Sequence, residues 1–136
     1  MSSQLNVDTI VDKAGSGGSN VKMANTSTYV SDGGATTQNT VQALTKVWLL
    51  GGDDASLTDS FNTASGTDNG TGDYTYTFTS AMSSANFTSH ATGANNARRY
   101  GFSEARATTT NRFDYRDEGG NAADNTNSSA MHGDLA

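Results

Sequence analysis

The residues best suited to recognition chemistry are arginines interleaved with aromatic side chains in the C-terminal half of the chain. The candidate surface-recognition residues are Arg98, Arg99, Tyr100, Arg112 and Tyr115. A guanidinium group can lie over an aromatic ring, and this pairing anchors interfaces and contacts sugars. The same arginines could instead pair with the many aspartates across a subunit interface. The pattern therefore predicts either a surface that recognises a ligand or a contact between subunits.

Residue types and spacings that support catalysis are scarce. His90 and His132 lie far apart in the chain, with no Ser-His-Asp or His-x-x-His spacing around them. The only glutamates are Glu104 and Glu118, and there is no cysteine. General acid–base and nucleophilic catalysis both depend on such groups at set spacings. We therefore expect no enzymatic activity, no catalytic residues and no cofactor.

Three acidic loops offer oxygen ligands, around Asp53, Asp68 and the segment 117–124. Calcium takes about six to eight oxygens, and the EF-hand loop spaces them regularly and ends in a glutamate. None of these loops has that spacing. Asp or Asn followed by Gly also favours tight turns. We expect turns and no metal site, with ion binding by the 117–124 loop as the alternative.

The composition limits the class of protein. Ser, Thr, Asn and Gly supply 64 of the 136 residues, whereas Leu, Val, Ile and Phe supply 18. Folding costs about 1–2 kcal/mol of backbone entropy per residue. Because a core this small offsets little of that cost, the composition predicts an oligomer. The net charge of −6 argues against a nucleic-acid partner. The longest apolar run, Val47–Leu50, predicts no membrane insertion and no signal peptide.

The first 36 residues read as an extended N-terminal arm. A short strand-like stretch near the N-terminus has apolar residues at alternating positions, Leu5, Val7 and Val11, and also contains Ile10. A Gly/Ser-rich segment follows at residues 15–19. Such a ribbon cannot bury enough surface by itself. The arm therefore needs a partner surface, and Leu5, Val7, Ile10 and Val11 are its candidate attachment residues.

From Thr36 the apolar spacing changes to that of a helix. Val41, Leu44 and Trp48 stand three and four residues apart, as in a heptad seam. The pattern predicts a short helix, which could pack about a symmetry axis as an oligomer interface or lie on the sheet of its own domain. Residues 46–50 are then expected to turn into a strand.

The rest of the chain predicts antiparallel strands. In Asp73–Thr79 three aromatics alternate with three threonines, and Asp68-Asn69-Gly70 is a hairpin signal before it. Ser56–Phe61 is the expected partner strand. Weaker strands are expected at 86–91, 98–102, 112–116 and 128–135. The predicted fold is mainly β, with an extended arm (1–36), a short helix and an antiparallel β-sandwich-like domain (37–136). Because no valine or isoleucine follows Val47, the part of the chain after it is expected to build its core from aromatics, Met, Ala and Thr.

Several segments resemble a known family. Leu5–Gly15, Thr40–Trp48, Leu57–Asn62 and Thr67–Phe78 are similar to tail-fibre-like virion structural proteins of marine bacteriophages. A small-residue stretch ending in an aromatic, Ser80–Phe87, follows the last of these as it does in that family. The resemblance covers residues 5–15 and 40–87, and beyond residue 87 only a general strand pattern remains.

The resemblance implies a homotrimeric bacteriophage structural protein located in the virion. The N-terminal arm would attach to other virion proteins of the tail or capsid, and the β-rich domain would contact the host surface, including its glycans. Tail fibres usually contain a shaft, which this short chain lacks, so a head fibre or a capsid-decorating protein is the alternative. A carbohydrate-binding module is the second alternative, and the lack of a signal peptide disfavours a secreted adhesin.

Overall fold

The structure is a computed structural model that describes residues 28–30, 37–93 and 99–135. The chain divides into two compact units, Met1–Val41 and Gln42–Ala136. In the first unit, β1 (Thr28–Val30) pairs antiparallel with β2 (Thr37–Asn39). The four-residue helix α1 (Thr40–Ala43) begins directly after β2 and includes the boundary between the units. The candidate attachment residues Leu5, Val7, Ile10 and Val11 lie outside the described residues.

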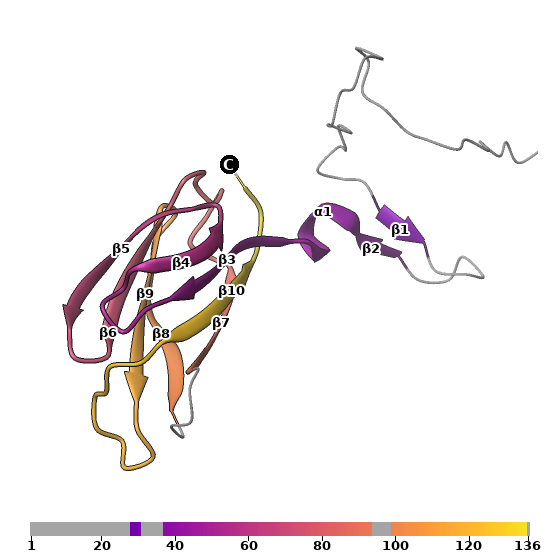
Figure 1. Ribbon diagram of the computed structural model, residues 1–136. Helices are drawn as coiled ribbons and strands as arrows, with labels where there is room; N and C mark the ends of the chain where they lie inside the picture. Colours follow the sequence, from indigo (N-terminus) through magenta and orange to yellow (C-terminus); the bar gives the residue numbers. More distant parts are fainter. Residues whose placement is uncertain (1–27, 31–36, 94–98, 136) are drawn as a thin grey trace, which may run out of the picture. The chain divides into compact units, whose positions relative to one another are not determined.

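The second unit consists of eight antiparallel strands in one sheet (Figure 1). The order across the sheet is β4-β3-β10-β7-β8-β9-β6-β5. The strands are β3 (Thr45–Gly51), β4 (Leu57–Phe61), β5 (Thr63–Gly70), β6 (Asp73–Phe78), β7 (Thr88–Gly93), β8 (Tyr100–Arg106), β9 (Thr110–Arg116) and β10 (Asn127–His132).

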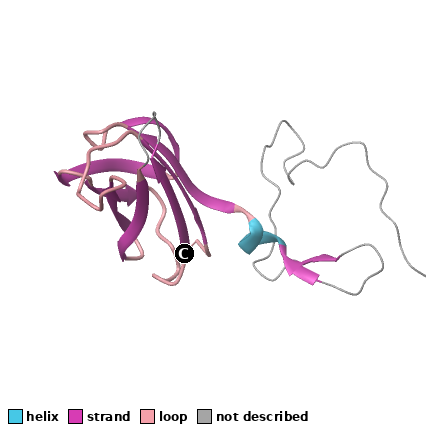
Figure 2. Cartoon of the chain, turned by 90° about the horizontal axis from the view of Figure 1, so that it is seen from below, coloured by secondary structure: helices cyan, strands magenta, loops and turns pink. Residues whose placement is uncertain are grey.

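The sheet curls into a nearly closed barrel, as the view in Figure 2 shows. The predicted mainly antiparallel β fold is confirmed. The β-sandwich-like arrangement is wrong, because the eight strands form one hydrogen-bonded sheet and not two facing sheets.

Asn62 brings the two edges of the sheet together. It lies between β4 and β5, the first and last strands of the sheet, and has a left-handed φ of 58°, a conformation that asparagine tolerates. Its Nδ2 donates to the carbonyl oxygens of Lys46, at 3.2 Å, and Ser80, at 3.1 Å. Its Oδ1 accepts from the Ser80 N–H at 2.7 Å. One side chain therefore connects the start of β3 to the segment that follows β6.

The predicted hairpin forms, but its turn is Thr71-Gly72 and its first strand differs from the expected one. Asp68 Oδ1 accepts from the Gly70 N–H at 2.9 Å, and β5 pairs with β6 across the turn. The expected partner, Ser56–Phe61, instead forms β4 and pairs with β3. A tight turn pairs the strands that directly flank it, and the strand before Thr71-Gly72 is Thr63–Gly70, so the residues expected to turn are the end of β5.

The barrel interior is filled mainly by aromatic side chains. Tyr74, Tyr76 and Phe78 of β6 are buried, which confirms the predicted alternation of this strand. The whole cluster comprises Val47, Leu49, Ala55, Tyr74, Tyr76, Phe78, Met82, Phe87, Phe113, Tyr115 and Met131. The expected contribution of aromatics, Met and Ala is confirmed. The expected contribution of threonine is wrong, since no threonine whose side chain the structure describes is buried.

Polar groups satisfy the hydroxyls of the buried tyrosines. The Tyr74 hydroxyl donates to the Asp53 carbonyl at 2.8 Å and accepts from the Asn125 N–H at 3.1 Å. The Tyr115 hydroxyl and Ser129 Oγ are 3.2 Å apart. Burial raises the pKa of Tyr74 to about 12. These hydroxyls are therefore neutral structural groups, and the partners keep their burial from being costly.

The predicted heptad seam is wrong. Val41 belongs to α1, whereas Trp48 lies in the middle of β3, so the two do not share a helix face. In β3, buried Val47 and Leu49 alternate with outward Trp48 and Leu50, which is the period of a strand. The predicted strand over residues 46–50 is confirmed.

Candidate surface-recognition site

Large apolar side chains gather on the outer face of the barrel, over β4 and β3. Trp48 is 39% exposed, and Leu50 and Phe61 are also exposed. Trp48 lies opposite Phe61 in the β3–β4 pairing and opposite Ala130 in the β3–β10 pairing. These residues are outward because the alternate residues of β3, Val47 and Leu49, fill the core.

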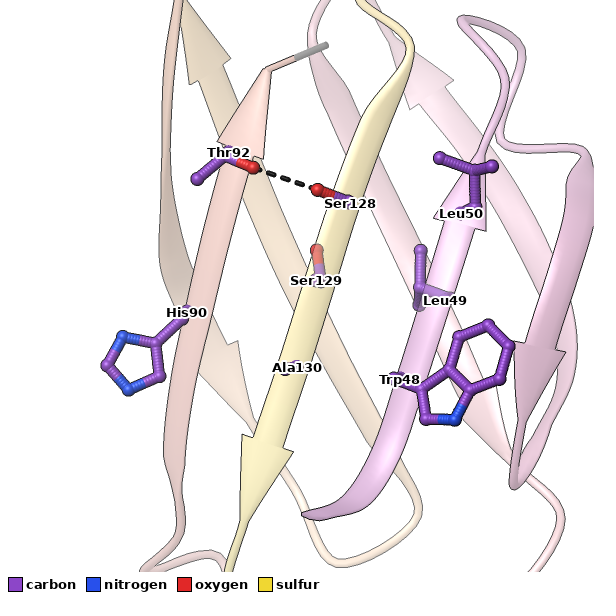
Figure 3. A pocket seen from close by; sticks show the side chains of 8 residues that line it. All are labelled: Trp48, Leu49, Leu50, His90, Thr92, Ser128, Ser129 and Ala130. Carbon is purple, nitrogen blue, oxygen red and sulfur yellow. Dashed lines mark hydrogen bonds between the residues drawn. The ribbon is translucent and has the colours of Figure 1, made fainter.

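Small side chains on β10 leave a groove on this face. Ala130 lies between Trp48 on one side and His90 on the other in the strand register, and Figure 3 shows these two rings on opposite sides of β10. The groove has a volume of about 390 Å³. Its lining consists of Trp48, Leu49 and Leu50 from β3, Ser128, Ser129 and Ala130 from β10, and His90 and Thr92 from β7.

The polar groups of the groove lie on β7 and β10. Thr92 Oγ1 and Ser128 Oγ are 2.8 Å apart in an exposed hydrogen bond, drawn in Figure 3. The His90 ring packs edge-on against the His132 ring, with centroids 6.3 Å apart. The sequence spacing of the two histidines does not indicate this contact, which the β7–β10 pairing creates. The lining thus combines aromatic and aliphatic surface with hydroxyl and imidazole groups.

Next to the groove, β8 carries two aromatic rings on the same outer face. Tyr100 is 50% and Phe102 is 42% exposed, and their rings are stacked at an interplanar angle of 28° with centroids 6.5 Å apart. The Arg116 guanidinium lies 5.9 Å from the centre of the Phe102 ring. Tyr100 is opposite Thr92 in the β7–β8 pairing, so these rings continue the groove across the sheet.

Beyond these rings, the outer face of β8, β9 and β6 carries ion pairs. Arg112 bonds both carboxylate oxygens of Asp73 and lies 3.1 Å from a Glu104 oxygen. Arg116 bonds both oxygens of Asp114, at 3.1 and 2.5 Å. The hydrogen bonds from Arg112 hold the pKa of Asp73 below its ordinary 3.8. The pairing of arginine with aspartate expected between subunits thus occurs within one chain at both residues.

The structure separates the predicted recognition residues. Tyr100 is exposed on the outer face, and Arg112 is engaged by carboxylates. The prediction that Tyr115 is a surface residue is wrong, because its side chain is fully buried in the barrel. Arg99 precedes β8 and is half-buried, with Nε enclosed, and Arg98 lies outside the described residues.

The predicted oligomer residues are likewise separated. Leu44 is 56% exposed just before β3, and Trp48 lines the groove. Of Val41 the structure describes only the backbone, in α1.

The acidic loops act as turn formers in the described residues. Asp117 Oδ1 accepts from the N–H groups of Gly119 and Asn121, at 2.9 Å each, and these bonds keep the pKa of Asp117 lowered. Asp124 Oδ1 accepts from the Gly72 N–H at 2.8 Å. Within the described part of the chain, no three His, Asp or Glu side chains gather in a group that could hold a metal ion.

Comparisons with known proteins assign no family to the chain. No family model matches it, and no significant match appears among curated proteins or solved structures. In the described residues, no helix is long and apolar enough to cross a membrane.

Proposed function

We propose that this chain is a bacteriophage virion structural protein of the tail-fibre-like kind. Its N-terminal region attaches to other virion proteins, and its C-terminal barrel contacts the host surface. The observation that carries the proposal is the group of half-exposed aromatic rings, Trp48, Tyr100 and Phe102, on the outer face of a barrel whose interior is already filled. Exposed apolar patches of this kind mark interaction sites.

The resemblance to tail-fibre-like proteins supports the same assignment. Its segment 40–87 spans α1, the strands β3 to β6 and the residues that connect them, and it supplies eight of the eleven residues of the core cluster. The segment 5–15 belongs to the separate first unit. A protein that joins a particle through one unit and presents a surface with the other needs this division.

Labelling the particle tests the location. Gold-labelled antibody against the barrel should bind the tail in electron micrographs of intact phage. Deleting residues 2–30 should leave a folded barrel that no longer joins the particle. Label on the capsid would favour a head fibre or a capsid-decorating protein instead. Normal incorporation of the shortened chain would contradict the attachment role of Leu5, Val7, Ile10 and Val11.

The proposed assembly is a homotrimer, on the resemblance to tail-fibre-like proteins. Leu44, exposed before β3, is the candidate contact residue. Because it is not part of the barrel core, Leu44→Asp should dissociate the trimer and leave the barrel folded. Light scattering with far-UV circular dichroism separates these effects. A wild-type mass of 14.1 kDa would contradict the oligomer.

A carbohydrate-binding module is the second candidate, favoured by the groove over Ala130 with its hydroxyl and imidazole groups. The two functions are compatible, because a virion protein can contact its host through a glycan. We propose no catalytic role and no cofactor for either.

A further inference from the structure

The groove over β10 and the rings on β8 form one continuous strip. Along the first row of paired residues, Leu50 faces Ser128, Ser128 faces Thr92, and Thr92 faces Tyr100. A parallel row runs from Trp48 through Ala130 to His90. Strands in a sheet are about 4.8 Å apart, so the strip spans about 14 Å from β3 to β8. It therefore suits an elongated ligand lying across the strands.

The chemistry of the strip changes from strand to strand. Apolar rings and chains occur on β3 and β8, at Trp48, Leu50 and Tyr100. Hydroxyl groups occur between them, on Ser128 and Thr92. None of the eight residues that line the groove is Lys, Arg, Asp or Glu. Arg112 and Arg116, on the outer face beyond the strip, already bond carboxylates of this chain.

From these features we propose that the strip binds an uncharged hexopyranose oligosaccharide. Its positively polarised C–H face stacks on Trp48, with a further ring on Tyr100, because aromatic faces carry negative charge density. Sugar hydroxyls exchange hydrogen bonds with Thr92, Ser128 and the His90 imidazole, which can each donate or accept. Ala130, with a single methyl group, leaves room for the sugar ring between Trp48 and His90.

A second copy of this chain is a poorer occupant of the strip. A stable protein interface buries about 800 Å² per partner around an apolar centre. Here the centre of the strip is the hydroxyl pair of Thr92 and Ser128, and the apolar residues lie on either side of it. An anionic polysaccharide is also disfavoured, because Arg112 and Arg116 are neutralised by carboxylates and the chain carries a net charge of −6.

The inference rests on the proposed contact with the host surface, but its test uses purified full-length protein and does not depend on the virion. A glycan array carrying maltohexaose, cellohexaose and mannohexaose beside sialylated and sulfated glycans is the first measurement. We expect binding to at least one neutral series, with affinity unchanged by added salt. Binding to none of the glycans, or to the anionic ones alone, would overturn the proposal. Failed labelling of the tail would leave this result untouched.

Three variants locate the site by titration with the best neutral hexasaccharide from the array. Trp48→Ala should weaken binding about tenfold or more, and Ala130→Phe should abolish it by filling the groove. Phe61→Ala is the matched control, since Phe61 is an exposed aromatic paired with Trp48 but does not line the groove. It should change affinity less than about twofold. Equal loss in Phe61→Ala and Trp48→Ala would overturn the location.

Two further measurements separate binding from structure and from assembly. Tyr100→Ala should lower the affinity for the hexasaccharide but not the affinity for the corresponding disaccharide, because Tyr100 lies at the far end of the strip. Trp48→Tyr should keep most of the affinity, since it retains a stacking ring. A change of oligomeric mass in Trp48→Ala with unchanged glycan affinity would assign the groove to a contact between copies and refute the proposal.

Discussion

Phe113 and Phe102 lie on neighbouring strands of one sheet and have opposite environments. Phe113 is fully buried, between the rings of Tyr76 and Tyr115 at centroid distances of 6.2 and 6.3 Å. Phe102 is on the outer face, beside Tyr100 and under Arg116. The side of the strand, and not the residue type, decides whether an aromatic supports the fold or remains available to a ligand.

The tyrosines show the same contrast in their polar groups. Inside the barrel, the Tyr76 hydroxyl exchanges hydrogen bonds with the Asn127 amide at 3.1 and 3.2 Å. Outside, Tyr100 leaves half of its surface to solvent. The hydroxyls of the inner tyrosines thus find their partners within the chain, whereas the outer face has apolar surface that the fold itself does not bury.

The largest expected effect is the loss of an inner ring. Phe113→Ala should lower the free energy of unfolding by about 3–5 kcal/mol, because it opens a cavity in a fully buried site. Phe102→Ala should lower it by less than about 1 kcal/mol. Urea denaturation followed by circular dichroism, at one protein concentration, measures both. Similar losses would contradict the assignment of the two faces.

A smaller effect is expected from removing an inner hydroxyl. Tyr76→Phe should lower the free energy of unfolding by about 1–2 kcal/mol, since the buried Asn127 Oδ1 loses its hydrogen-bond donor. The Asn127 amide nitrogen keeps its bond to the Asn125 carbonyl at 3.3 Å, which limits the loss. Tyr100→Phe is the outer control and should stay within about 0.5 kcal/mol. The same urea titration measures both variants. A larger loss of stability in Tyr100→Phe than in Tyr76→Phe would contradict the contrast between inner and outer tyrosines.

Local pattern was sufficient to predict several strands and one face of the core. The alternation in Asp73–Thr79 places its aromatics inside, as the structure shows. The same rule, applied to 112–116, would have placed Phe113 and Tyr115 inside and the arginines outside. The interleaving of arginine with aromatic residues predicts a surface position for Tyr115, but adjacent residues of a strand face opposite sides of the sheet, so Tyr115 lies inside and Arg116 outside.

The groove could not be predicted from local pattern. It exists because β10 pairs with both β3 and β7, which sets Ala130 between Trp48 and His90. β10 reads Asn-Ser-Ser-Ala-Met-His, with polar Asn127 and Ser129 facing inward, so no apolar alternation marks its inner face. Strand order in a sheet depends on contacts between segments far apart in the chain, and a single sequence does not reveal them.

The smallest expected effect concerns the ion pair between Asp73 and Arg112 on the outer face. Asp73→Asn should lower the free energy of unfolding at pH 7 by about 0.5–1 kcal/mol, because both side chains are partly exposed and water screens the pair. The pKa of Asp73 is lowered from 3.8 in the folded state. The ion pair therefore stabilises the fold fully above 3.8, and its contribution disappears as the pH falls through the folded pKa.

Urea titrations across this pH range measure the difference in the free energy of unfolding between wild type and Asp73→Asn. This difference should become smaller as the solution becomes more acidic. In an Arg112→Met background, Asp73→Asn should cost less than in the wild type, since the partner is already gone. Affinity for the neutral oligosaccharide should not change, because the ion pair lies beyond the aromatic strip. A difference in stability that grows toward acidic pH would mean that Asp73 is not stabilised in its charged form, and the outer arginines would then remain free to attract an anionic ligand.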